Sequence, residues 1–186
     1  MPFHTTNIAK LLVFEPKVFG DSRGYFFESY NEKIFVEQGI DFRFVQDNQS
    51  SSTYGVIRGL HYQLPPHAQT KLVRVLKGNV LDVAVDIRAN SPTYGKSFCL
   101  ELSAENKKQL FIPVGFAHGF AVLSEEAEVL YKCDAFYNKE SDAGISYNDP
   151  ALNIDWQIPP GSRIISGKDM VLPLLADCKN NFVYEG

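Results

Sequence analysis

Short alternations of apolar and polar residues fill the chain from Leu11 to Tyr137. Glycine and proline residues separate them, and no long stretch repeats apolar residues at the spacing of a helix. Alternation with a period of two is typical of strands that bury one face. The pattern therefore predicts an all-β protein.

The segment from residue 80 to residue 88 gives the clearest alternation. Asp82, Asp86 and Arg88 lie at even-numbered positions (one parity), and aliphatic residues fill the odd-numbered positions (the other parity). Successive side chains of a strand point to opposite faces of the sheet. We expect the aliphatic face to lie in the core and the polar face to be wet or functional.

A second segment, from residue 129 to residue 137, predicts the direction of two tyrosines. Charged residues take one parity, and the other parity belongs to Val129, Tyr131, Cys133, Ala135 and Tyr137. Both tyrosines are therefore expected to point inward.

Helical signals are few and short. Asn31 is a suitable N-cap for a segment that Gly39 ends, and Ser166 is a suitable N-cap for a segment that Pro173 soon interrupts. Many short strands with a few peripheral helices, and no linker or repeat, predict one domain over residues 1–186 with a sandwich or jelly-roll fold. The interior of a jelly-roll barrel is a natural ligand pocket.

Charge and apolar content narrow the classes of function. The formal net charge is -4 without a run of lysines or arginines, so we expect neither nucleic acid nor an anionic membrane as partner. No leader-like segment opens the chain, and no apolar stretch reaches the ~18 residues of a membrane span, so a cytoplasmic protein is expected. Cys99, Cys133 and Cys178 are odd in number and far apart, which predicts reduced thiols, mostly in the core.

Residues around two histidines resemble the motifs of the cupins, which are jelly-roll (double-stranded β-helix) proteins. Gly55 and His61 fit the start of the first cupin motif, and Pro113, Gly115 and His118 fit the middle of the second. The resemblance implies a cupin-like barrel that has kept a histidine.

The metal ligands of the cupin motifs are not conserved in this chain. Gln63 stands where the second histidine is expected, Lys71 where a carboxylate is expected, and Val122 where an asparagine is expected. A lysine ammonium has no lone pair and repels a divalent metal, so we expect no metal. In the alternative interpretation, both histidines are hydrogen-bonded core residues and Lys71 lies at the surface.

Five long runs, in order along nearly the whole chain, resemble the dTDP-4-dehydrorhamnose 3,5-epimerases. The runs cover residues 19–30, 45–63, 71–95, 112–124 and 131–152. The resemblance implies a cofactor-independent isomerase of dTDP-L-rhamnose synthesis, a route to lipopolysaccharide or cell-wall polysaccharide. Its substrate would be dTDP-4-dehydro-6-deoxy-D-glucose, inverted at C3 and C5 to give dTDP-4-dehydro-L-rhamnose.

The resemblance also implies four catalytic residues. His61 matches the base that removes a proton beside the C4 ketone, Tyr131 the acid on the opposite face, and Lys71 the cation at the developing oxyanion. Asp169 matches the carboxylate paired with the base. The stretch from Ser166 to Asp169 is also typical of a helix cap, and this alternative stays open.

Further positions match residues that bind the nucleotide and sugar in the same family. The resemblance assigns Arg23, Arg58, His118 and Lys168 to phosphate and sugar, Glu28, Gln46, Asp47 and Asn48 to the nucleoside, and Tyr137 to stacking on thymine. It also implies a homodimer in which N-terminal strands cross to the partner and Arg23 serves the neighbouring site.

Three alternative functions remain open at this point. No residue in the sequence excludes a related sugar-nucleotide epimerase of antibiotic pathways that inverts only one centre. A metal-dependent cupin, such as a dioxygenase or a phosphosugar isomerase, is disfavoured by Gln63 and Lys71. A non-catalytic sugar-binding cupin would not need a base, an acid and an inward lysine together.

Overall fold

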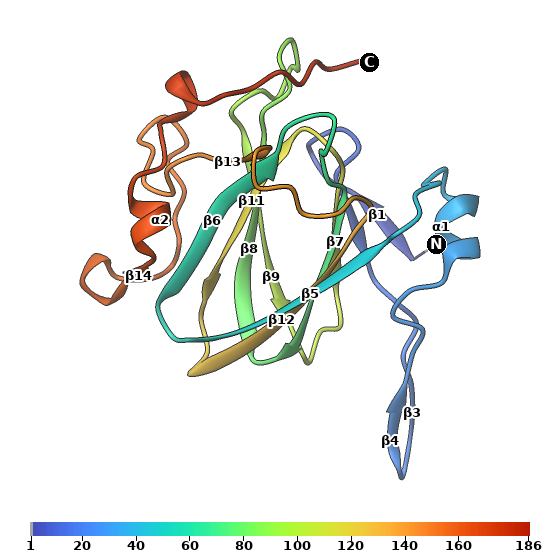
Figure 1. Cartoon of the computed structure of the whole chain (residues 1–186). Helices are drawn as coiled ribbons and strands as arrows, with labels where there is room; N and C mark the ends of the chain where they lie inside the picture. Colours follow the sequence, from blue (N-terminus) through green and yellow to red (C-terminus); the bar gives the residue numbers. More distant parts are fainter. Residues whose placement is uncertain (1) are drawn as a thin grey trace.

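The computed structural model describes residues 2–186, and most of its regular structure is strand (Figure 1). The elements of the two main sheets and their helices are β1 (Phe3–Thr5), β2 (Leu12–Phe14), α1 (Glu32–Glu37), β5 (Gln46–Thr53), β6 (Val56–Gln63), β7 (Lys71–Lys77), β8 (Asn79–Asp86), β9 (Ser97–Ser103), β10 (Gln109–Ile112), β11 (Phe116–Val122), β12 (Glu126–Cys133), β13 (Asp142–Gly144), β14 (Ile164–Ile165) and α2 (Gly167–Met170). A hairpin, β3 (Phe19–Asp21) and β4 (Gly24–Phe26), and two single turns of 3-10 helix, Pro160–Ser162 and Leu175–Asp177, complete the structure.

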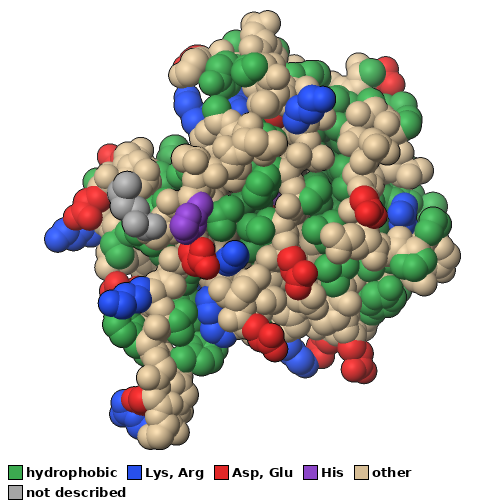
Figure 2. Space-filling model, turned by 180° about the vertical axis from the view of Figure 1, so that it is seen from behind, with side chains coloured by type: hydrophobic (Ala, Val, Ile, Leu, Met, Phe, Trp, Pro, Cys, Tyr) green, Lys and Arg blue, Asp and Glu red, His purple; other side chains and the backbone are tan. Residues whose placement is uncertain are grey.

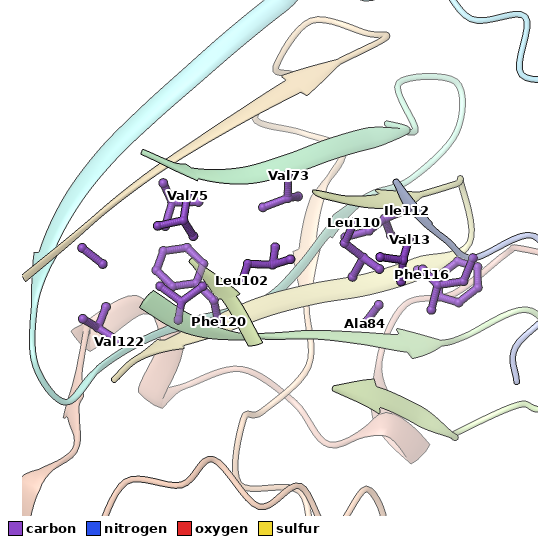
Figure 3. Packing of buried hydrophobic residues seen from close by; sticks show 14 of the residues in the cluster. Val13, Val73, Val75, Ala84, Leu102, Leu110, Ile112, Phe116, Phe120 and Val122 are labelled. Atoms are coloured by element: carbon purple, nitrogen blue, oxygen red, sulfur yellow. The ribbon is translucent and has the colours of Figure 1, made fainter. Parts of the chain in front are cut away.

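Two sheets face each other and form the predicted jelly roll. One sheet has the strand order β1-β2-β10-β7-β12-β5, and the other has the order β13-β6-β11-β8-β9, with β14 beside β6. All of these pairings are antiparallel except that of β14 with β6. Figure 3 shows apolar side chains of both sheets meeting between them, including Val73, Ala84, Leu110 and Phe120.

The strand predicted over residues 80–88 is present as β8, but its second face is not wet. Asp82 and Asp86 are fully buried and Arg88 is 5% exposed. Strand β8 lies between β11 and β9, and its two apolar faces belong to different core clusters. Val80 and Ala84 pack inside the barrel, whereas the residues of the other parity pack against C-terminal residues that include Trp156 and Phe182. The face that carries Asp82 and Asp86 therefore points into the barrel, and the C-terminal segment covers the aliphatic face.

The prediction for residues 129–137 is confirmed in its first half and wrong in its second. Val129 and Cys133 are buried, and Tyr131 packs against the core inside the barrel. Strand β12 ends at Cys133, so the parity argument does not extend to Ala135 and Tyr137. Tyr137 is 57% exposed because it lies on the loop that follows the strand.

Both predicted helix caps are present. The Asn31 side chain accepts a hydrogen bond from the Lys33 N–H at the start of α1. The Ser166 hydroxyl accepts one from the Asp169 N–H at the start of α2. These local signals were sufficient because a cap needs only residues that are neighbours in sequence.

The cysteines are unpaired among the described residues, but the expectation that most lie in the core is only partly met. Cys133 is buried, Cys178 is half-buried and Cys99 is exposed. Cys99 lies on β9, the edge strand of its sheet, where one face points away from the core.

The β3–β4 hairpin projects away from the barrel (Figure 1). Phe19, Tyr25 and Phe26 on this hairpin expose more than half of their surface. Figure 2 shows the hairpin from behind as a narrow arm with charged side chains near its tip. An arm of this kind buries few apolar side chains within its own chain.

Candidate active site

A cavity of about 560 Å³ lies between the two sheets and α2. Strands β6 and β11 of one sheet and β7 and β12 of the other supply side chains to its wall. The cavity brings together most of the residues predicted for catalysis and binding: Arg58, His61, Lys71, His118, Tyr131, Tyr137, Lys168 and Asp169. Residues that are far apart in the sequence therefore share one site.

A bulge between β6 and β11 explains how Arg58 and His61 both reach the cavity although their parities differ. His118 lies opposite His61, but Phe120 lies opposite Arg58, so the register shifts between the two pairs. Gly59 sits at this shift with a φ of 125°, and a Cβ there would lie 2.6 Å from the Gly119 Cα. Only glycine permits both the backbone conformation and the close approach.

His61 and Asp169 form a hydrogen-bonded pair in the cavity wall. Nε2 of His61 lies 2.8 Å from Oδ1 of Asp169, which is 3% exposed. The second carboxylate oxygen accepts a hydrogen bond from the Gly59 N–H at 3.2 Å. This pairing places the ring proton of His61 on Nε2, and no described residue bonds Nδ1, which is left to accept a proton.

Asp169 stays charged in this environment. Burial raises the pKa of Asp169, but the hydrogen bonds from His61 and the Gly59 N–H outweigh burial and hold the pKa below its ordinary value. The cap and the carboxylate pair are compatible, because they involve different groups of Asp169. Its backbone N–H donates to the Ser166 hydroxyl, and its carboxylate bonds His61. The segment therefore forms a helix cap and also supplies the carboxylate that pairs with His61.

Lys71 and Tyr131 approach the cavity from the opposite sheet. Their strands are antiparallel neighbours, with Lys71 opposite Cys133 and Tyr131 opposite Val73. Nζ of Lys71 lies 5.8 Å from the centre of the Tyr131 ring. Lys71 is only 9% exposed, so the alternative of a surface lysine is wrong.

Burial shifts the pKa values of both side chains. The pKa of Lys71 is lowered by burial, although the carboxylates of Asp82 and Asp142 favour its charged form. The pKa of Tyr131 is raised by burial, which keeps the phenol protonated and able to donate a proton. The cavity therefore holds a cation and a phenolic acid on one sheet and a histidine–carboxylate pair on the other.

His118 forms a second histidine–carboxylate pair deeper in the barrel. Its Nε2 lies 3.0 Å from Oδ2 of Asp82, and both side chains are buried. The alternation placed Asp82 on the polar face of β8 but did not identify it as a partner of His118. His118 lies opposite His61 on the next strand and lines the cavity. It therefore offers a ligand one more nitrogen donor or acceptor.

The mouth of the cavity carries charged and aromatic groups. Arg58 donates from Nε to the Ser52 hydroxyl at 3.0 Å. Asp142, which the sequence did not single out, accepts from Lys168 Nζ at 2.5 Å and from the Tyr137 hydroxyl at 3.2 Å. Its acidic side chain had no motif around it, so only the fold reveals it. Arg58 and Lys168 together give the mouth of an acidic protein a local positive pair suited to an anion.

The remaining predicted residues do not line this cavity. Arg23 lies in the projecting hairpin, where it pairs with Asp21, and its side chain is 88% exposed. Glu28 accepts a hydrogen bond from Asn31, outside the cavity. The structure of one chain therefore does not bring these two residues to the site.

Three predicted residues at the start of β5 bond other parts of the chain. Asp47 pairs with Lys132 at 3.0 Å. The Gln46 side chain donates to Asn48 Oδ1 at 2.9 Å, and the Asn48 side chain donates to the Cys133 sulfur. These residues lie beside the Tyr131 strand without reaching the cavity wall.

Residues 2–186 contain neither a membrane-spanning helix nor a cluster of metal ligands. No described helix is both long and apolar enough to cross a membrane. No group of three or more His, Cys, Asp or Glu side chains within this range is arranged to hold a metal ion.

Comparisons with known proteins agree on one family. The model of the dTDP-4-dehydrorhamnose 3,5-epimerases matches residues 5–177. The enzyme of that name from Shigella flexneri is 58% identical over 89% of this chain and 91% of its own. A crystal structure of the Elizabethkingia anophelis enzyme has 55% identity and a TM-score of 0.91 over 94% of this chain and 96% of its own. The Legionella pneumophila dTDP-6-deoxy-D-glucose-3,5-epimerase, in complex with dTDP-4-keto-L-rhamnose, has 50% identity and a TM-score of 0.90 over 94% and 93%.

Proposed function

We propose a function from one premise: the chain belongs to the dTDP-4-dehydrorhamnose 3,5-epimerase family. The enzyme is an isomerase that converts dTDP-4-dehydro-6-deoxy-D-glucose into dTDP-4-dehydro-L-rhamnose by inverting C3 and C5. The observation that supports this most directly is the His61–Asp169 pair in a cavity that Lys71 and Tyr131 enter from the other sheet. A base and an acid from opposite walls are what inversion through an enolate requires.

In the proposed first step, Nδ1 of His61 takes the proton from a carbon next to the C4 ketone. The electron pair of that C–H bond moves toward the C4 oxygen and forms an enolate. Asp169 stabilises the imidazolium through Nε2, since a buried carboxylate favours the charged ring. The Lys71 ammonium lies inside the same cavity and stabilises the oxyanion.

In the second step, Tyr131 gives its phenolic proton to the opposite face of the same carbon. The carbonyl re-forms, the configuration is inverted and a phenolate remains. The phenolate then takes a proton from solvent, and His61 releases its own, which restores both groups. The same sequence at the second carbon completes the reaction without a cofactor.

The nucleotide half of the substrate would occupy the mouth of the cavity. At the mouth we assign Arg58 and Lys168 to the pyrophosphate and Tyr137 to the thymine ring, and farther inside we assign His118 to the sugar. Local cations with charge-assisted hydrogen bonds can hold a dianion even in a chain of net charge -4. This half of the site supplies binding energy and leaves the chemistry to the inner half.

We also propose a homodimer in which the β3–β4 hairpin reaches the site of the partner. The hairpin projects away from its own barrel and carries exposed aromatic residues. The Arg23 side chain at its turn is 88% exposed. Glu28, Gln46, Asp47 and Asn48 would complete the nucleoside pocket with it. The protein would act in the cytoplasm as one domain over residues 1–186.

The function can be tested by proton exchange in deuterated water. The purified protein is incubated with dTDP-4-dehydro-6-deoxy-D-glucose, and deuterium at C3 and C5 is followed by NMR together with the configuration of the product. We expect deuterium at both carbons and the L-rhamno product. Deuterium at a single carbon would identify a mono-epimerase, and binding without any exchange would identify a non-catalytic cupin.

A metal-dependent cupin is the alternative that chelation tests. Lys71 and Gln63 occupy the positions where cupins carry metal ligands, so we expect epimerisation to survive exhaustive dialysis against a chelator at an unchanged rate. A loss of activity that iron, manganese or zinc restores would contradict the assignment. Metal content of the dialysed protein, measured in parallel, shows that removal was complete.

A further inference from the structure

The loop of residues 135–138 carries Tyr137 at the mouth of the cavity, yet apolar packing of its aromatic side chains does not hold it. Phe136 is 68% exposed and Tyr137 is 57% exposed. An exposed loop without buried side chains is ordinarily mobile. Something else must therefore fix its backbone.

Three glutamine side chains bond the backbone of this loop from three different segments. Gln69 Nε2 donates to the Ala135 carbonyl at 2.8 Å. Gln46 Oε1 accepts from the Tyr137 N–H at 3.0 Å. Gln63 Oε1 accepts from the Asn138 N–H at 2.7 Å, and its Nε2 donates to the Phe136 carbonyl at 3.2 Å. Every residue of the loop is bonded to one of these amides.

Gln63 is the central member of the set. It is 4% exposed, and it follows His61 by two positions on β6, so both side chains line the cavity. Its Nε2 also donates to the His67 carbonyl at 2.6 Å, so both amide hydrogens are used within the protein. A buried amide with both N–H bonds satisfied by backbone is built to hold that backbone rather than to donate to a ligand.

We propose that Gln63, supported by Gln69 and Gln46, is a positioning residue that presets Tyr137 as a platform for the nucleobase. A stacking ring adds affinity only to the extent that the loop is already ordered, because ordering it on binding costs conformational entropy. The proposal rests on the proposed function, since it concerns the nucleoside end of a dTDP-linked ligand. It predicts that Gln63 controls nucleoside affinity through Tyr137 and leaves the anion-binding end alone.

The test compares Gln63→Met with the wild-type protein, using dTDP and inorganic pyrophosphate as calorimetric probes. Methionine keeps the length and volume of the side chain and removes its hydrogen bonds. We expect dTDP to bind about tenfold more weakly to the variant and pyrophosphate to bind equally well. The KM for the sugar nucleotide should rise by a similar factor, whereas kcat at saturation should change by less than about twofold.

A double variant separates positioning from general support of the fold. If Gln63 acts through the ring, Gln63→Met should add no further loss of dTDP affinity in a Tyr137→Ala background. Gln69→Met removes a single hydrogen bond to the same loop, so it is a milder change that can be used if Gln63→Met is poorly folded. Asn180→Leu is the matched control: its amide holds the Ile87 carbonyl of a different loop, and its loss should leave dTDP affinity unchanged.

Three results would overturn the inference. They are wild-type dTDP affinity in both Gln63→Met and Gln69→Met, an equal loss of dTDP affinity in the Tyr137→Ala background, or a parallel loss of pyrophosphate binding. Failure of the proposed function itself looks different, because the wild-type protein would then either not bind dTDP or bind it without exchanging protons at C3 and C5 of the keto sugar.

Discussion

At the scale of single residues, the division of labour between His61 and Tyr131 is the central question. If His61 removes the proton, His61→Asn should abolish both epimerisation and deuterium incorporation, because no enolate forms. Tyr131→Phe should still form the enolate and return the proton from the His61 side. Incorporation with retained configuration should then persist while inversion falls by roughly 10²–10⁴-fold.

NMR of deuterium at C5, read with the configuration of the product, measures both quantities. Binding of dTDP and the thermal melting of each variant provide the controls. Deuterium incorporation at the wild-type rate in His61→Asn would refute the assignment of His61 as the base. Undiminished inversion in Tyr131→Phe would refute the assignment of Tyr131 as the acid.

The role proposed for Lys71 at the oxyanion requires a buried cation, which opposes stability. Its side chain is buried, and no described residue gives it an ion pair or a hydrogen bond. We expect Lys71→Met to abolish epimerisation and to stabilise the fold by about 1–3 kcal/mol, because a buried charge is removed.

The free energy of unfolding that Lys71→Met gains should decrease as the pH rises. Burial lowers the pKa of Lys71 in the folded state, so the native protein releases the proton before the unfolded chain does. Wild-type stability therefore recovers as pH rises through the folded pKa, and the advantage of the variant should shrink. Denaturation with urea at neutral and alkaline pH measures the difference, and a gain that grows with pH would contradict this account.

At the scale of elements, the short helix α2 links a cap to the His61–Asp169 pair. Ser166→Ala removes the hydroxyl that accepts from the Asp169 N–H at 3.1 Å, a bond worth about 1 kcal/mol. Because the same residue carries the carboxylate that holds His61, we expect kcat/KM to fall about five- to tenfold. Ser166→Asp, which restores a capping oxygen, should recover most of it.

Ser103→Ala is the matched control for this change. Its hydroxyl also accepts from the N–H three residues later, that of Asn106, but in a surface turn away from the cavity. An equal loss of activity in Ser103→Ala would show that capping acts through global stability instead of through Asp169.

The same elements show why sequence could predict some features and not others. The caps at Asn31 and Ser166 depend on neighbours within three residues, so they could be read directly. The burial of Asp82 depends on the closed barrel, in whose interior it pairs with His118 of β11, and the inward direction of both Arg58 and His61 depends on a bulge. Asp142 and Gln63 act through partners on other segments. Periodicity describes one strand at a time and carries no information about these contacts.

At the scale of the whole molecule, the projecting hairpin allows the proposed exchange of residues to be tested by mixing. Arg23→Ala lacks the donated arginine, and His61→Asn lacks the base. If Arg23 serves the partner, a mixed dimer contains one intact site, so co-refolded variants should regain about a quarter of wild-type activity.

Each variant alone, refolded in the same way, provides the baseline, and light scattering checks that the products are dimers. If Arg23 acted on its own chain, each subunit of the mixed dimer would keep one defect. The mixture would then show no gain over the average of the two variants.

The strand order also determines when the molecule can fold. Strand β2 near the N-terminus pairs with β10, where Phe14 lies opposite Gln109, and β5 pairs with β12. Strand β2 can meet β1 early, but a ribosome must synthesise more than half of the chain before β2 meets β10 or β5 meets β12. Until then their edges stay open to other chains, and closure of such distant pairings takes about milliseconds to seconds in comparable β proteins. Expression of this enzyme should accordingly benefit from slow translation and from chaperones that shield strand edges.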